Sequence, residues 1–324
     1  MSMDRRVTFI LTRMTNVKFE QITGPMECGE GPHWDSSRKC LYFVDINRSL
    51  VLRYVPETNE VFHAKVDGPS VSLIIPIKDT KDKFLIGVGR CIAIMTWDGV
   101  KETVTKNDLK VLYEVDEDKP NNRFNDGKTD ARGRLFAGTM GAFINGAWED
   151  ARGSLFIFEA NKKQRVVADG IGIANGLAWS LDYKHFYYID SLAYRIDVFD
   201  YDLDTGEATN RRVLFDLKTN GVKGLPDGMC IDNCGNLWVA LYEGGMMCLD
   251  PITKQVIHKF DLPGCHITSV AFGGENLDEL YVTSAAQHMT PEERRTHPFF
   301  GCTFKIVGLG VKGLDGIPYS GIRR

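Results

Sequence analysis

The stretch DSSRKCLYFV (residues 35–44) places a polar turn directly before a run of large apolar and β-branched side chains. A turn of Asp, Ser and Lys residues followed by such a run is typical of a β-hairpin. The pattern recurs five times, as DTKDKFLI (79–86), DARGRLFA (130–137), SLDYKHFYYI (180–189), DNCGNLWVA (232–240) and GENLDELYV (274–282). Because no long helical period interrupts the series, we expect an all-β chain.

The hairpins define a repeat whose units begin at equivalent residues, 11 or 12 positions before the centre of each apolar run. These residues are Glu30, Ser72, Asn125, Asn175, Asp227 and Ser269. Neighbouring members lie 42 to 53 residues apart. A period of roughly 40–50 residues with four strands per unit is typical of a propeller blade. We therefore predict one six-bladed β-propeller domain over residues 16–324.

Closing the ring requires a strand from the opposite end of the chain, because the first and last blades otherwise leave open sheet edges. Residues 17–22 alternate between apolar and polar types and are free to pair with residues 303–307. Residues 1–15 contain Arg5, Arg6 and Arg13. We expect them to form a flexible extension, with a transit peptide as the alternative.

The overall composition excludes several classes of function. A net charge of −4 gives no basic footprint for nucleic acid, and no apolar stretch approaches the roughly 20 residues of a membrane span. The eight cysteines form no CxxC pair and no tight Cys/His cluster, which disfavours a cysteine-based zinc site. We expect reduced thiols, a cytoplasmic location, no nucleic-acid or membrane partner, and a monomer or weak dimer.

The six equivalent residues should converge on the propeller axis, because they open the innermost strands of a pseudo-sixfold ring. Buried carboxylates and amides are costly without partners. The oxygens of Glu30, Asn125, Asn175 and Asp227 are hard donors that suit Ca²⁺ and tolerate Mg²⁺ or Mn²⁺. We predict one divalent ion here, calcium first, with magnesium, manganese or zinc left open. The alternative is that these side chains cap turns and bind only water.

Longer motifs extend over almost the whole chain, from about residue 17 to about residue 318. They are GEGPHWD (29–35), NNRFNDGK (121–128), AGTM (137–140), ANGLAWS (174–180) and PDGMCID (226–232). In these motifs the chain resembles the regucalcin and gluconolactonase family, which includes the insect luciferin-regenerating enzymes. The resemblance implies a six-bladed propeller whose channel metal is bound by Glu30, Asn175 and Asp227.

The same resemblance suggests roles for the remaining site residues. It implies that Asn125 contacts the metal or the substrate and that Arg123 binds substrate oxygens. For Arg123 the alternative is a structural ion pair with Asp126. Asp190 either supports Asn175 from behind or is an ordinary turn residue.

The family resemblance implies hydrolysis of a small lactone or ester, with Asp227 as the general base. One departure concerns specificity, since Phe143 stands where family members that hydrolyse sugar lactones have an acid that contacts sugar hydroxyls. A less polar lactone or ester is therefore expected, and residues 141–153, with Trp148, are either a lid or a surface loop. The alternatives are a calcium-binding regulatory protein without catalysis, or an enzyme with phosphotriesterase or luciferin-regenerating activity.

Overall fold

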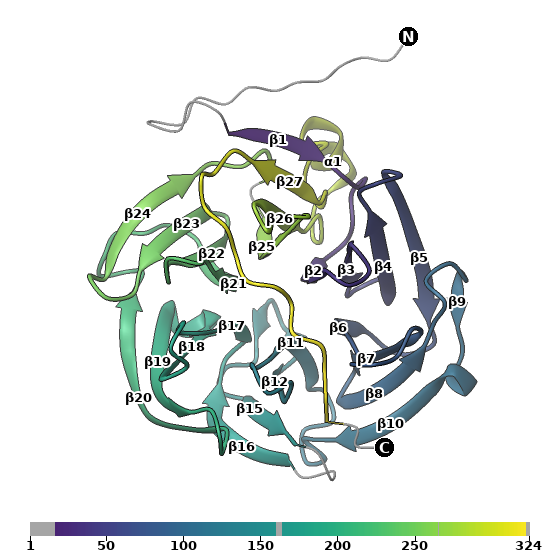
Figure 1. Ribbon diagram of the computed structural model, residues 1–324, viewed down its shortest axis with the longest axis horizontal. Coiled ribbons are helices and arrows are strands. Elements are labelled where there is room, and N and C mark those ends of the chain that lie inside the picture. Colours follow the sequence, from purple (N-terminus) through teal and green to yellow (C-terminus); the bar gives the residue numbers. More distant parts are fainter. Residues whose placement is uncertain (1–16, 160–163, 265, 322–324) are drawn as a thin grey trace.

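Six antiparallel sheets form a closed ring in the computed structural model of the chain, which describes residues 17–159, 164–264 and 266–321 (Figure 1). Each sheet is one blade, and the strand that opens its repeat unit, which is β25 in blade 6, lies nearest the axis. The prediction of an all-β, six-bladed propeller is confirmed.

The first three blades contain the following strands. Blade 1 consists of β2 (Gly29–Asp35), β3 (Cys40–Asp45), β4 (Leu50–Val55) and β5 (Glu60–Val66), with the short β9 (Thr103–Val104) added in parallel to β5. Blade 2 consists of β6 (Val71–Pro76), β7 (Lys83–Val88), β8 (Cys91–Thr96) and β10 (Leu109–Glu114), with the 3₁₀ turn η1 (Lys106–Asp108) before β10. Blade 3 consists of β11 (Arg123–Thr129), β12 (Leu135–Met140), β15 (Gly153–Phe158) and β16 (Gln164–Ile171), with the inserted hairpin β13 (Phe143–Ile144) and β14 (Ala147–Trp148).

The second half of the ring has the same plan. Blade 4 consists of β17 (Ala174–Trp179), β18 (His185–Asp190), β19 (Arg195–Asp202) and β20 (Glu207–Asp216), with the 3₁₀ turn η2 (Ser191–Ala193) after β18. Blade 5 consists of β21 (Leu225–Ile231), β22 (Leu237–Tyr242), β23 (Gly245–Asp250) and β24 (Gln255–Phe260). Blade 6 consists of β25 (Ile267–Gly273), β26 (Glu279–Ser284), β27 (Phe304–Val307) and β1 (Lys18–Gln21), with helix α1 (Pro291–Thr296) between β26 and β27.

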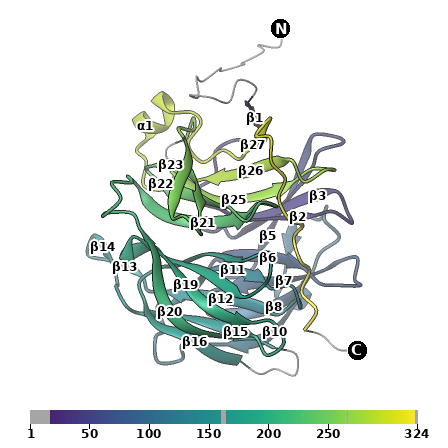
Figure 2. The same cartoon turned by 60° about the vertical axis from the view of Figure 1, so that its left-hand side comes forward.

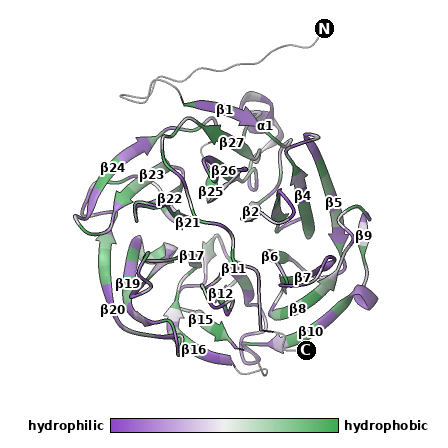
Figure 3. Cartoon of the chain, in the orientation of Figure 1, coloured by the Kyte–Doolittle hydropathy of each residue, from purple (hydrophilic) through white to green (hydrophobic). Residues whose placement is uncertain are grey.

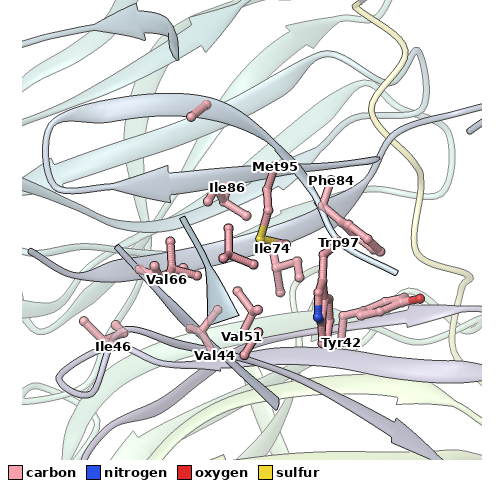
Figure 4. Packing of buried hydrophobic residues seen from close by; sticks show 14 of the residues in the cluster. Tyr42, Val44, Ile46, Val51, Val66, Ile74, Phe84, Ile86, Met95 and Trp97 are labelled. Atoms are coloured by element: carbon pink, nitrogen blue, oxygen red, sulfur yellow. The ribbon is translucent and has the colours of Figure 1, made fainter. Parts of the chain in front are cut away.

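The core lies between the blades. Hydrophobic clusters in the described part of the chain each join two neighbouring sheets around the ring. Figure 4 shows the cluster between blades 1 and 2, where Tyr42, Phe84 and Trp97 pack with ring centroids 4.9 and 6.0 Å apart. Because both faces of each sheet are covered, inner strands such as β3 are buried throughout, and the first five residues of β3 are the apolar ones of the repeated sequence run. The outer strand β24 alternates between exposed and partly buried residues before the buried Phe260, and the outer strands carry both hydrophilic and hydrophobic positions (Figure 3).

Strand β1 closes the ring. It pairs antiparallel with β27, with Lys18 opposite Val307 and Gln21 opposite Phe304, and Phe19 packs against the cluster between blades 5 and 6. The predicted pairing of residues 17–22 with residues 303–307 is therefore confirmed. The predicted extension at residues 1–15 lies outside the described residues.

The two ends of the channel are covered differently. The C-terminal segment 308–321 crosses one face of the ring (Figure 1) and forms bridges next to the distal ends of inner strands, between Asp232 and Gly313 and between Ile77 and Tyr319. The hairpin β13–β14 and helix α1 lie on the opposite face (Figure 2). Within the described residues, no helix combines the length and the apolar character needed to cross a membrane.

Candidate metal centre

A backbone irregularity occurs in every innermost strand at or beside the residue that sequence analysis placed on the axis. The pairing of each first strand with the second strand of its blade shifts register there, for example between Asn175 and Leu177 and between Pro226 and Met229. A β-bulge bends the strand and redirects a side chain. The bulges thus help turn the six equivalent residues toward the channel, and all six side chains are buried.

Glycine follows Asn175 and Asp227, where neighbouring inner strands approach each other closely. A Cβ atom on Gly176, which follows Asn175, would lie 2.8 Å from the carbonyl oxygen of Asp227. A Cβ atom on Gly228 would lie 2.0 Å from the hydroxyl oxygen of Ser269 in the next blade. Both distances are shorter than any normal contact, so the ANG and DG motifs are needed for the blades to approach each other at the site.

Hydrogen bonds connect the polar side chains across blades 3 to 5. Nη1 of Arg123 donates to Oδ1 of Asn125 at 2.7 Å, and Nδ2 of Asn125 donates to Oδ1 of Asn175 at 3.2 Å and to the carbonyl oxygen of Ala174 at 2.9 Å. Nδ2 of Asn175 in turn donates to Oγ of Ser191 at 2.8 Å. The structure therefore brings three of the predicted residues into one connected network.

Ser191 fixes the orientation of the Asn175 amide. Its hydroxyl donates to the carbonyl oxygen of Pro226 at 2.6 Å, so its oxygen acts as the acceptor for Asn175. This arrangement holds the amide nitrogen of Asn175 away from the site and leaves its oxygen as the group available to a cation. Such outer contacts commonly orient metal ligands. Sequence analysis did not identify Ser191. The available signal was its position directly after β18, because the end of β18 pairs with the start of β17, where Asn175 lies.

Asp190, which sequence analysis considered as the support for Asn175, has a different role. Its Oδ1 accepts hydrogen bonds from the backbone N–H groups of Gly172 and Ile173, at 3.2 and 3.3 Å. It thus holds the segment that leads into β17, and the residue that contacts Asn175 is its neighbour Ser191.

Three buried carboxyl groups from different blades gather at the same level of the channel. Burial raises the pKa of Glu30 to about 8, and the nearby Asp126 carboxylate adds to the shift. Burial likewise raises the pKa of Asp227 well above its usual value, with further contributions from Glu30 and Asp126. Burial also raises the pKa of Asp126, although Lys128 opposes this effect. If all three groups were ionised, the centre would therefore hold more negative charge than its surroundings compensate.

The arrangement fits a divalent cation. Oδ1 of Asp227 is buried without a hydrogen-bond partner, and no ion pair to Glu30, Asp126 or Asp227 occurs in the part of the chain that the structure describes. Two carboxylates and an oriented amide oxygen are the ligands that Ca²⁺ prefers. No group of three or more His, Cys, Asp and Glu ligands is found in the described residues. Oδ1 of Asp126 accepts the N–H of Gly127 at 2.7 Å.

The structure also shows the positions of the two serines among the six equivalent residues, of Arg123 and of His33. Ser72 and Ser269 are buried at the axis, and no hydrogen bond joins their side chains to the carboxyl groups in the described structure. The alternative pairing of Arg123 with Asp126 does not occur among the described ion pairs, since the Arg123 guanidinium hydrogen-bonds to Asn125 and to the carbonyl oxygen of Phe124. His33, near the other end of the channel, is buried, and burial lowers its pKa to about 4.

Comparison with known proteins identifies the family. The sequence profile described as "SMP-30/Gluconolactonase/LRE-like region" matches residues 28–286. The chain belongs to this family. The match spans most of the propeller, from just before β2 to just after β26, and includes all four residues predicted to surround the metal.

Individual members of the SMP-30/gluconolactonase family cover nearly the whole chain. Regucalcin of Pongo abelii is 41% identical over 311 residues, which are 95% of this chain and 100% of the relative. A solved luciferin-regenerating enzyme is 39% identical, covers 94% of this chain and 100% of its own, and superposes with a TM-score of 0.88. A calcium-binding protein, regucalcin, from Agrobacterium tumefaciens is 28% identical, with coverage of 92% and 96% and a TM-score of 0.81.

Proposed function

We propose that this protein is a divalent-metal-dependent hydrolase of small lactones, of the gluconolactonase type. The observation that carries the proposal is the pair of buried carboxyl groups, Glu30 and Asp227, which have raised pKa values and an unpartnered Asp227 oxygen beside an oriented amide oxygen. A purely structural role would have paired these carboxyl groups with cationic side chains, because a buried carboxylate without a counter-charge is costly when it is ionised. The Glu30, Asn175 and Asp227 side chains are the proposed ligands.

A bound divalent cation supplies Lewis acidity, which polarises a carbonyl group and makes water more acidic. The residues of the chain then have distinct tasks. Asp227 accepts the proton of the attacking water as general base. Asn125 positions the substrate beside the ligands, since its amide bridges Arg123 and Asn175.

Arg123 is the proposed substrate-binding cation. Among the described residues, only its Nη1 group has hydrogen-bond partners, so Nε and Nη2 remain free to donate to substrate oxygens. A guanidinium next to a carbonyl stabilises the negative charge that develops on its oxygen during attack. Arg123 also lines the groove that opens beside the channel mouth.

The ion is proposed to be calcium, with magnesium, manganese or zinc as alternatives to be tested. The hard oxygen donors favour calcium, and the Agrobacterium tumefaciens relative is described as calcium-binding. This second point also favours a second candidate function, in which the protein binds calcium in a regulatory role without catalysis. The seven described cysteines are free thiols, which supports a location in the reducing cytoplasm.

A turnover assay on metal-stripped protein separates these functions. γ-Butyrolactone, a phenyl ester and a phosphotriester would each be supplied with calcium, magnesium, manganese or zinc, and metal binding would be measured by calorimetry. Lactone hydrolysis that a chelator abolishes supports the proposal. Calcium binding without turnover would replace it with the regulatory function, and turnover of the phosphotriester alone would indicate a phosphotriesterase.

A further inference from the structure

A short hairpin, residues 141–153, extends from blade 3 over the mouth of the channel. We call it the lid hairpin. At its tip Asn145 and Gly146 have φ values of 53° and 83°, which is the left-handed pair that a tight type I′ hairpin turn requires. At its base, the N–H of Glu149 donates to the carbonyl oxygen of Ala142 at 3.0 Å, and a carboxylate oxygen of Glu149 accepts the N–H of Ala142 at 3.1 Å. The lid hairpin is therefore a regular β-hairpin with a defined turn and a hydrogen-bonded base.

The lid hairpin reaches the opposite side of the ring. Phe143 lies 5.7 Å from the ring of His288, which follows β26 in blade 6, and 5.0 Å from Trp148 in edge-on geometry. Blades 3 and 6 face each other across a six-bladed ring, so the contact of Phe143 with His288 spans the mouth. This contact lies across the path by which a ligand would enter the channel along its axis. The space beside the lid hairpin is the other route to the channel.

That space is a groove of about 1000 Å³. Arg123 lies at its inner end, Phe143 and Trp148 form one wall, and Leu109 and Val111 line its outer part. Because Arg123 also donates to Asn125 in the metal centre, the groove and the centre share a residue. Ligand pockets usually occupy about 300–1,000 Å³, so this groove has room for considerably more than a single lactone ring.

Arg90 and Asn122, two polar residues of the groove, hydrogen-bond within the protein. Arg90 donates to the carboxylate of Glu114 at 2.9 Å and to the carbonyl oxygens of Val115 and Asp116 at 2.9 and 3.1 Å. The side chain of Asn122 donates to Asp116 at 2.7 Å. What the inner groove offers to a ligand is thus the Arg123 guanidinium and apolar surface, including Phe143, which is 48% exposed.

We propose that the substrate carries an extended apolar group that lies in this groove against Phe143 and Trp148, while its lactone ring reaches the metal centre past Arg123. Phe143 and Trp148 are then specificity-determining residues for a lipophilic lactone. This inference rests on the proposed lactonase function. It adds to that function a second binding region, outside the channel, that recognises the substituent.

The test is a series of γ-lactones whose unbranched alkyl tail grows from methyl to octyl, with a polyhydroxylated aldonolactone for comparison. Burial of one methylene contributes about 0.8 kcal/mol when complete. We expect kcat/KM of the metal-loaded protein to rise about two- to fourfold per methylene, until the groove is filled. The aldonolactone should be a poorer substrate than the octyl lactone.

Variants of the lid hairpin test whether Phe143 and Trp148 form the wall of the groove that binds the alkyl tail. Phe143→Ala should lower kcat/KM for the octyl lactone about five- to tenfold and leave the methyl lactone nearly unchanged, and Trp148→Leu should act in the same direction. Ile144→Ala is the matched control, because Ile144 lies in the same strand, is 42% exposed and does not line the groove. His288→Asn removes the ring across the mouth but suits the left-handed backbone at this position, where φ is 65°, and it should preserve the dependence on chain length.

Each outcome decides the question. Hydrolysis of the methyl lactone without any gain from longer tails would overturn the groove proposal and leave the lactonase function standing. An equal loss in Ile144→Ala or His288→Asn would show that Phe143 is not the wall. Failure to hydrolyse any lactone with any divalent ion would overturn the proposed function and this inference together.

Discussion

At the scale of single residues, Asp227 combines two demands that a substitution can separate. An asparagine side chain still offers an oxygen to a cation but cannot accept a proton. Asp227→Asn should therefore retain measurable metal binding and lose lactone turnover by about 10²–10⁴-fold. Calorimetric metal titration and lactone hydrolysis on the same preparation provide the two readouts.

Ser72→Ala is the matched control for this experiment, since it removes a buried hydroxyl at the axis that has no hydrogen-bond partner among the described residues. It should change neither metal affinity nor turnover by more than about twofold. Full turnover in Asp227→Asn would remove Asp227 as the general base and shift attention to Asp126, the other buried carboxyl group at this level of the channel.

The sequence predicts the residues that face the channel, but it does not predict the residues that hold them in place. Glu30, Asn125, Asn175 and Asp227 were identifiable because each opens a repeat unit, so one periodicity places all of them at the axis. Ser191 belongs to no such series, and its contact with Asn175 depends on how η2 turns after β18. Asp126 follows Asn125, and only the bulge between Phe124 and Gly127 makes consecutive side chains of one strand serve the same channel.

At the scale of elements, ring closure by β1 is a direct physical prediction of the fold. Deleting residues 1–22 should expose the edge of β27 and the apolar surface covered by Phe19, lowering the free energy of unfolding by about 2–4 kcal/mol and promoting aggregation. Deleting residues 1–15 is the control, and should leave the urea midpoint unchanged. Equal stability of the two truncated proteins would show that β1 is not required for closure.

Sequence patterns predicted the inner hairpins better than the insertions. The runs around Tyr42 and Trp238 are buried on both faces and follow clear turn signals. For the lid hairpin the sequence alone allows either a lid or a surface loop, although its Asn145-Gly146 dipeptide is a strong signal for a two-residue hairpin turn. Its apolar flanks are too short to register as strands, and its contact with His288 depends on the diameter of the ring rather than on local sequence.

At the scale of the whole molecule, the metal centre makes stability depend on pH in an unusual direction. The folded-state pKa of Glu30, about 8, lies above the ordinary value of 4.5, and the pKa of Asp227 is also raised. The folded, metal-free protein therefore holds protons that the unfolded chain releases. The stability from these groups is complete below about pH 4 and is lost as the pH rises through about 8, by up to about 1.4 kcal/mol per pH unit for each proton.

Bound metal should reverse this trend, because a cation favours the ionised carboxylates and its binding displaces their protons. In a chelator, the melting temperature should fall between about pH 5 and about pH 8, whereas saturating calcium should remove the fall and raise the melting temperature most at the alkaline end. Glu30→Gln is the control: it keeps the size of the side chain, and its metal-free melting temperature should depend less on pH. A metal-free wild-type protein that instead gains stability over this range would mean that the carboxyl groups are already compensated within the fold and do not need a cation at the axis.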